Sequence, residues 1–125
     1  METQHRHTRR ALGARGEDLA VEHLLEQGWA VIERNWRCRN GEIDIIAADP
    51  EGTVVFVEVK CRAGTGYGDP LEAITYAKTR RLRQLAGLWL AEHQEGSARV
   101  RLDAIGVIVS RGQGPRIHHV KGIGS

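Results

Sequence analysis

An acid and a base stand two residues apart at the end of the most apolar run in the sequence. Glu58 and Lys60 close the segment TVVFVEVKC, which is dense in β-branched residues. Such a run is typical of a central strand buried on both faces. Residues two apart on a strand point to one face and lie roughly 7 Å apart, so the two charges project together. They form either an ion pair at a sheet edge or part of a site that does chemistry.

Two further acids precede this segment. Asp44 lies within the apolar sequence EIDIIAA, where a buried carboxylate without a partner costs free energy, so it needs a partner or a cation. A turn at residues 49–52 predicts a hairpin that brings Asp44 level with Glu58. Carboxylates that converge in this way can hold Mg²⁺ together with water and substrate phosphates. Glu42 shares the face of Asp44 and is expected either to support the site from outside or to be a surface acid beside a turn.

A third acid lies in a helix predicted over residues 10–27. Helical projection places Glu17 near the apolar face that contains Ala20 and Leu24, whereas the other acids of the helix fall on the far side. Glu17 therefore points inward. It either contributes to the metal site, directly or through water, or pairs with a neighbouring arginine.

The rest of the sequence predicts the elements that position these acids. Strands are expected over residues 29–38, 42–48, 53–61, 98–110 and 116–120. The first two are joined by a tight turn at Asn40-Gly41. A glycine-rich loop over 62–69 leads to a helix with Asp69 as its N-cap, which runs to about Glu92 and could be split near Thr75. The order α-β-β-β-α-β-β predicts an α+β or α/β domain with helices packed on a mixed sheet.

The order of these residues resembles a known nuclease superfamily. An acid on the first helix, an Asp on the second strand and Glu-x-Lys on the third are similar to the PD-(D/E)xK pattern. Within that superfamily, GARGEDLAVEHL, NWRCRNGEIDIIA, VVFVEVKCR, GDPLEAI and KTRRLRQLA resemble the YraN-type family of predicted bacterial endonucleases, which is similar at a distance to archaeal Holliday-junction resolvases. The resemblance covers about residues 12–110 and implies a restriction-endonuclease-like fold. One departure is Ile43, which replaces the proline that precedes the aspartate in the superfamily.

The resemblance implies roles for four residues. Glu17, Asp44 and Glu58 would hold Mg²⁺, or Mn²⁺ in its place, and Lys60 would be the catalytic lysine. A bound divalent ion activates water at neutral pH and offsets charge in the transition state. A lysine beside it can orient the water, and removing one such contact typically costs about 100- to 1000-fold in rate. We therefore expect Lys60 to have the largest effect after Asp44 and Glu58.

Basic residues cluster at several places and suit a polyanionic partner. We expect salt-sensitive phosphate contacts that position DNA without reading its sequence from Arg15, Arg37, Arg39, Lys78, Arg80, Arg81 and Arg83. A single cluster of this kind can equally be a solvated face. Lys78 projects onto an otherwise apolar helix face, so either it reaches a phosphate in the site or the helix restarts near Ala77.

Composition limits the other classes of function. The chain has 125 residues and a formal net charge of +2, which predicts one domain over 11–121 between a flexible basic tail, 1–10, and a C-terminal tail, 122–125. No window contains the roughly 18 apolar residues of a membrane span, and no apolar stretch of a signal peptide follows the start, so we expect a cytoplasmic protein. Two cysteines outside any ligand spacing predict reduced thiols. The glycine-rich loop lacks the ending of a P-loop, and no small-molecule cofactor is expected.

The sequence thus predicts a Mg²⁺-dependent endonuclease that acts on DNA by structure more than by sequence. The alternative is a non-catalytic or partner-dependent DNA-binding accessory in recombination, repair or uptake. A third interpretation is a structural domain whose carboxylates are ion-paired. Because so short a chain offers little surface for a large substrate, a homodimer or a helicase-like partner is expected.

Overall fold

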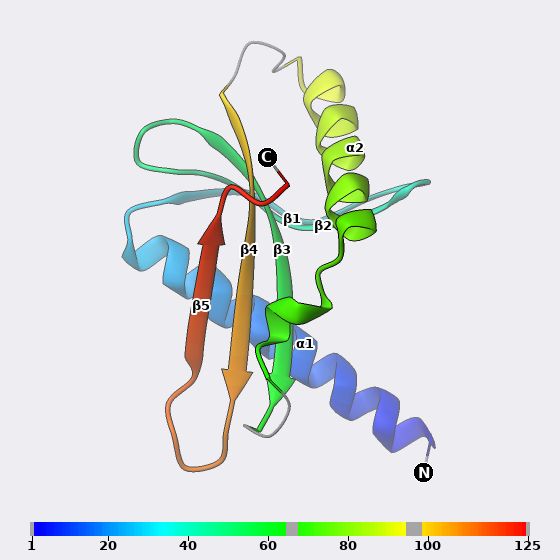
Figure 1. The fold of residues 1–125 in the computed structure, drawn as a ribbon, viewed down its shortest axis with the longest axis vertical. Helices are drawn as coiled ribbons and strands as arrows, with labels where there is room; N and C mark the ends of the chain where they lie inside the picture. The colour runs from blue at the N-terminus through cyan, green and yellow to red at the C-terminus, as the bar shows by residue number, and fades with distance from the viewer. Residues whose placement is uncertain (1, 65–67, 95–98, 125) are drawn as a thin grey trace.

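The computed structural model describes residues 2–64, 68–94 and 99–124. Two helices, one 3₁₀ helix and five strands follow in the order α1 (Glu2–Glu26), β1 (Ala30–Cys38), β2 (Gly41–Ala48), β3 (Val54–Ala63), η1 (Pro70–Ala73), α2 (Tyr76–Glu92), β4 (Val100–Val109) and β5 (Arg116–Lys121) (Figure 1). This is the predicted order α-β-β-β-α-β-β, with η1 as the first part of the second predicted helix. The chain is a mixed α+β domain, consistent with a restriction-endonuclease-like fold.

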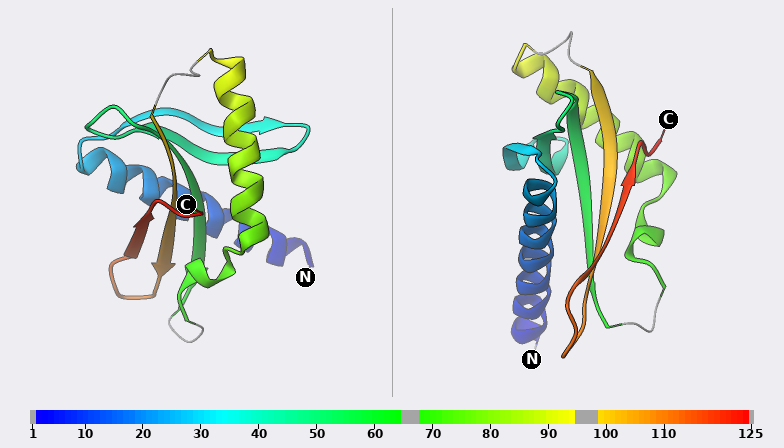
Figure 2. Two further views of the ribbon diagram at one scale, coloured as in Figure 1. Left: turned by 45° about the horizontal axis from the view of Figure 1, so that its top comes forward. Right: turned by 90° about the vertical axis from the view of Figure 1, so that its left-hand side faces the viewer.

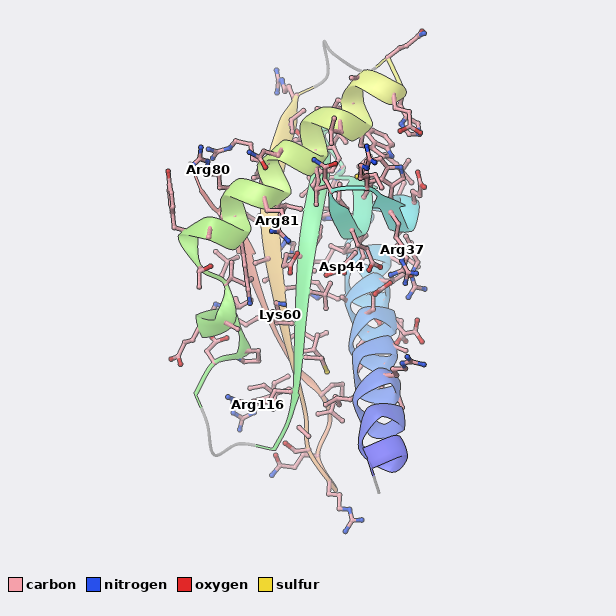
Figure 3. All side chains as sticks on the ribbon, turned by 90° about the vertical axis from the view of Figure 1, so that its right-hand side faces the viewer. Arg37, Asp44, Lys60, Arg80, Arg81 and Arg116 are labelled. Carbon is pink, nitrogen blue, oxygen red and sulfur yellow. The ribbon has the colours of Figure 1, made fainter. Side chains whose placement is uncertain are left out.

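The five strands form one mixed sheet in the order β1-β2-β3-β4-β5. β3 is the central strand; it pairs antiparallel with β2 and parallel with β4, and η1 and α2 make the crossover between the two parallel strands. α1 covers one face of the sheet and α2 with η1 the other (Figure 2; Figure 3). β1 is an edge strand whose pairing with β2 shifts register between Val31 and Glu33.

Each face of the sheet buries its own apolar cluster. On the α2 side, Phe56 packs with Leu85 and Trp89 of the helix. On the α1 side, Leu24 of the helix packs with Val57. The continuous apolar run of β3 is explained by this arrangement, because alternate residues serve opposite clusters. No helix within the described residues is long and apolar enough to cross a membrane.

The first helix differs from the prediction at its start. α1 ends at the predicted place, where Gly28 takes a φ of 85°, but begins at Glu2 rather than near Arg10. Residues 2–9 contain neither glycine nor proline, so the segment expected to be a tail continues the helix. The second predicted helix is divided near Thr75, where the sequence indicated a possible split. Asp69 caps η1 as predicted, and the Thr75 hydroxyl accepts a hydrogen bond from the Lys78 N–H to cap α2.

Two smaller corrections concern turns and the C-terminus. The turn of the first hairpin lies at Arg39 and Asn40, one residue before the predicted pair. Within the predicted C-terminal tail, the described residue Ile123 contacts the domain. Ile123 packs beside the core cluster on the α2 side, and its N–H donates to the carbonyl of Leu102 over 2.8 Å.

Candidate active site

β2 and β3 separate beyond the pair Ile45 and Val57, and we call the gap between them the fork. Asp44 is the next residue of β2 and lies level with Glu58 across the fork, as the sequence predicts. The N–H of Val59 donates to Oδ2 of Asp44 over 2.8 Å. A side-chain carboxylate has thus replaced the backbone acceptor that would have continued the ladder.

The electrostatic surroundings of Asp44 are unfavourable for its charged form. Burial raises the pKa of Asp44 to about 7; the hydrogen bond from Val59 opposes this, and the charges of Glu58, Glu17 and Glu42 add to it. Among the described residues, none forms an ion pair with Asp44. A cation beside the fork would relieve this strain on the carboxylate.

A cleft of about 470 Å³ opens on the side of the fork that faces α1. This α1-side cleft is lined by Arg10, Gly13, Ala14, Glu17, Arg34, Asn35, Arg37, Glu42, Asp44, Val59 and Cys61. Three of the four predicted acids therefore share one cavity, and Figure 3 shows Asp44 between β3 and α1.

Glu17 is held by two residues of β1. Arg34 contacts its Oε1 at 3.3 Å and also contacts Asp18 at 2.7 Å. The amide of Asn35 donates to Oε2 of Glu17 and to Oε1 of Glu42, both over 3.0 Å. Glu17 therefore points inward as predicted, and it also has the arginine partner that was the alternative.

The sequence analysis did not identify Asn35. It lies level with Asp44 in the register of β1 and β2, between the paired residues Arg34 and Trp36. Its φ of 53° is left-handed, a conformation that asparagine tolerates better than most residues. An asparagine inside a strand-like segment was the one signal available, and by itself it does not specify this role.

A second cleft, of about 390 Å³, opens on the other side of the fork. This α2-side cleft is lined by Gly41, Glu42, Glu58, Lys60, Ala77, Lys78, Arg81, Leu82 and Leu85. Nζ of Lys60 lies 3.3 Å from Oε1 of Glu58, so the two charges that project together form an ion pair. Lys78 also lines this cleft and donates to the carbonyl of Ala73 over 3.0 Å. The helix restarts at Tyr76, which is the second alternative for this lysine, and its contact with a phosphate stays a prediction.

The fork thus divides the predicted residues. Glu17 and Asp44 line the α1-side cleft, Glu58 and Lys60 line the α2-side cleft, and Glu42 lines both. Within the described part of the chain, no group of three acids, histidines or cysteines is arranged to hold a metal ion. One or two carboxylates with water are enough for Mg²⁺, so Asp44 and Glu58 fit the ion as oxygen donors. Glu17 would first have to leave its partners on β1.

The predicted basic residues are all exposed, but only some face the fork. Lys78 and Arg81 line the α2-side cleft, and Arg37 lines the α1-side cleft, where it lies 3.5 Å from Glu42. Arg80 points away from the sheet on the outer side of α2 (Figure 3). The remaining three do not line either cleft; they lie on α1, in the first hairpin turn and on α2 beside β4 and the C-terminal residues: Arg15, Arg39 and Arg83.

Comparison with known proteins places the chain in a family. Residues 16–107 match the family described as "Uncharacterised protein family UPF0102". The chain belongs to UPF0102. Its UPF0102 relatives include proteins of Mycobacterium ulcerans (58% identical, 94% of this chain and 97% of the relative) and Mycobacterium avium (56% identical, 99% and 98%). The resemblance to the YraN-type family is thereby confirmed.

Two solved structures show more distant likenesses. "Structure of EndoMS-dsDNA2 complex" is 18% identical with a TM-score of 0.37, over 64% of this chain and 26% of that chain. "The structure of Pyrococcus Furiosus SfsA in complex with Ca2+" is 18% identical with a TM-score of 0.42, over 90% and 64%. Both TM-scores are below 0.5, so neither likeness decides the function of the UPF0102 chain.

A second buried acid, Asp103 on β4, was also not identified from the sequence. Arg101 donates to its Oδ1 over 2.8 Å, Nε2 of His119 lies 2.8 Å from its Oδ2, and the N–H of Gly122 donates to Oδ1 over 3.0 Å. Burial raises the pKa of Asp103, but His119, Arg101 and Gly122 lower it more, so that it lies below the ordinary value. His23 of α1 continues the network, 3.3 Å from Nδ1 of His119.

Proposed function

We propose that this UPF0102 chain is a Mg²⁺-dependent endonuclease that hydrolyses DNA phosphodiester bonds and selects DNA by structure rather than by sequence. The observation that carries the proposal is the environment of Asp44. This buried carboxylate faces Glu58 across the fork, is surrounded by acids, and has no cationic partner among the described residues. A perturbed carboxylate in a cleft is a common mark of a functional site.

Asp44 and Glu58 would hold the ion, and Mn²⁺ could replace it. When bound there, a divalent ion makes water nucleophilic at neutral pH and offsets the negative charge of the transition state. Glu42, on the border of both clefts, would support the pair from outside. Glu17 would contribute only if Arg34 and Asn35 released it.

Lys60 has the chemistry and the place to act on the scissile phosphate. Its ammonium is 3.3 Å from Glu58, so the proposed metal-holding carboxylate and the lysine share one cleft. The ion pair with Glu58 holds the ammonium at the cleft. From there the ammonium would orient the attacking water and stabilise charge on the phosphate oxygens.

The cations around the fork support DNA as the substrate. Lys78 and Arg81 line the wall of the α2-side cleft opposite Lys60. Contacts of this kind hold phosphates without reading bases, which favours selection by DNA structure. Branched DNA would suit two copies of the chain, or a helicase-like partner, because one copy presents a single fork.

The test compares the unaltered protein with Lys60→Ala and Asp44→Asn on labelled duplex, single-stranded, flapped and four-way-junction DNA. Each is incubated with Mg²⁺, with Mn²⁺ and with chelator. Metal-dependent cutting by the unaltered protein, reduced about 100-fold or more by either change, is the expected result. Lys121→Ala removes an exposed lysine far along β5 and serves as the matched control. Equal cutting by all four proteins would reject the proposal.

A second candidate is a DNA-binding accessory that does not cut. Two observations favour it: Glu17 and Glu58 are both paired with cations, and no three-residue metal group exists among the described residues. On this view the unaltered protein binds branched DNA in all lanes and cuts none. It also predicts that Mg²⁺ leaves the melting temperature unchanged, whereas a metal held by Asp44 would raise it in the unaltered protein and not in Asp44→Asn.

A further inference from the structure

β3 carries one more cation beyond the candidate site. Phe56, Glu58, Lys60 and Arg62 alternate along the strand and share the face that α2 and η1 cover. The face changes from apolar to charged along its length, because Phe56 is core and the last three are not. Arg62 was not among the residues that the sequence singled out for nucleic acid.

The α2-side cleft continues past Lys60 into another hollow. This η1 hollow, of about 360 Å³, is lined by Lys60, Cys61, Arg62, Asp69, Pro70, Glu72 and Ala73. Lys60 lines both cavities, so the two adjoin at Lys60, and the η1 hollow lies on the side of the carboxyl end of β3.

The guanidinium of Arg62 is incompletely satisfied. Its Nε is shielded from solvent and has no hydrogen-bond partner among the described residues. A buried donor without an acceptor is uncommon in proteins and calls for an explanation, and a bound anion beside the guanidinium is one. For a guanidinium, a phosphate is the acceptor of matching geometry.

The sheet register places another arginine beside Arg62. Arg62 is level with Ile108 of β4, and Ile108 is level with Arg116 of β5. The two arginines therefore lie on one face, two strands and about 10 Å apart. Figure 3 shows Arg81, Lys60 and the exposed Arg116 following the same side of β3 toward its end, whereas Arg37 lies on the side of α1.

Two of the acids nearby have partners of their own, and one of them, Glu58, pairs with Lys60 at 3.3 Å. Asp69 accepts a hydrogen bond from the Leu71 N–H and lies 2.6 Å from Nδ1 of His118. The Leu71 N–H, His118 and the charge of Arg62 lower the pKa of Asp69, despite its partial burial. Asp69 is thus committed to holding η1 and β5 together, and Glu72 is the one other acid in the lining of this hollow.

We propose that Lys60, Arg62 and Arg116 bind successive phosphates of one nucleic-acid strand, which runs from the fork along β3 to the start of β5. The inference rests on the proposed function, because Lys60 is where the strand would meet the candidate active site. Lys60 and Arg62 are about 7 Å apart along the strand, and Arg116 continues the line across the sheet. A row of cations of this kind binds a single strand through its phosphate backbone and not through its bases.

The test measures binding of a labelled single-stranded oligonucleotide by fluorescence anisotropy over a range of salt concentrations. Asp44→Asn is the background, so that the strand is not cut. In that background Arg116→Ala is compared with Arg111→Ala, an exposed arginine in the turn between β4 and β5. Arg116→Ala is expected to reduce the salt dependence by about one single-strand phosphate contact, a slope change of about 0.7, and Arg111→Ala to leave it unchanged.

Reversing the charge sharpens the comparison. Arg116→Glu is expected to weaken binding about tenfold and Arg111→Glu much less. Arg62→Lys keeps the charge but loses the planar set of guanidinium N–H donors, so it is expected to weaken binding with little effect on folding. Because Arg116 is exposed, its variants test the proposal even if changes at Arg62 prevent folding.

Each outcome separates this inference from the proposed function. Binding that depends on Arg116, together with no cutting by the unaltered protein, supports the strand path and rejects the nuclease. Binding that does not depend on Arg116, together with metal-dependent cutting by the unaltered protein, rejects the path alone. Equal effects at Arg116 and Arg111, or no binding to the strand, also overturn it.

Discussion

Two aspartates occupy similar sequence and opposite environments. Asp44 in EIDII and Asp103 in LDAIGV both lie among apolar residues of the sheet. Asp103 is bound by an arginine, a histidine and a backbone N–H, whereas Asp44 has one N–H and three neighbouring carboxylates. Asp103 stabilises the fold in its charged form, whereas the charged form of Asp44 lowers the stability of the fold. Acids of the second kind are those that functional sites accumulate.

The largest expected effect tests the stabilising member of this comparison. Asp103→Ala leaves Arg101 and His119 without their acceptor and is expected to lower the free energy of unfolding by about 3 to 5 kcal/mol. Denaturant unfolding at neutral pH measures the loss. Glu51→Ala, an exposed acid in the turn before β3, is the control and is expected to change stability by less than about 0.5 kcal/mol. Similar losses of unfolding free energy in the two variants would contradict a stabilising role for Asp103.

At the fork, replacing Asp44 is expected to raise the free energy of unfolding rather than lower it. Asn at position 44 keeps an acceptor for the Val59 N–H and removes the charge, so Asp44→Asn is expected to raise the unfolding free energy at pH 8 by about 2 to 4 kcal/mol. The pKa of Asp44 is raised to about 7 in the folded protein, so its penalty is full above pH 7. As the pH falls toward 4, the folded carboxyl binds a proton and the penalty disappears. Denaturant unfolding at pH 8 and pH 4 should therefore show a gain only at pH 8.

Asp103→Asn provides the matched contrast in pH. Because the pKa of Asp103 is lowered in the folded protein, its stabilisation is present above the ordinary carboxyl pKa and is lost as the pH falls below it. The variant should therefore be least different from the unaltered protein in acid. A stability loss for Asp44→Asn at pH 8 would contradict the division between the two aspartates.

The smallest effect concerns Asn35, which joins two of the acids around Asp44. Asn35→Gly removes the two hydrogen bonds but tolerates the left-handed backbone, and is expected to cost about 1 kcal/mol. Asn35→Ala adds backbone strain of about 1 kcal/mol more. Thermal unfolding ranks the three proteins, and an alanine variant as stable as the glycine variant would show that the φ of 53° carries no strain.

The sequence predicted those features of the site that follow from the two-residue period of a strand. Glu58 and Lys60 share a face because they are two apart on β3, and the hairpin made the level of Asp44 predictable. The division into two clefts was not predictable, because it depends on the carboxylate of Asp44 replacing a backbone acceptor and opening β2 from β3.

Contacts between residues of different strands also could not be predicted from the sequence. Arg101 stands two residues before Asp103 and could have been noticed, but His119 reaches that acid only through the register of β4 and β5. The same holds for Arg62 and Arg116, which become neighbours through a shared partner on β4. Periodicity gives the face of a residue, whereas register gives its neighbours.

The irregular backbone of β1 has a consequence for self-association. As an edge strand, β1 presents backbone groups that another sheet could pair with, which is a common route to aggregation. The register shift after Val31 and the left-handed Asn35 interrupt that row of groups twice within one strand. These interruptions disfavour pairing between the sheets of two copies through β1, so the backbone geometry that gathers acids at the fork also protects this edge from aggregation.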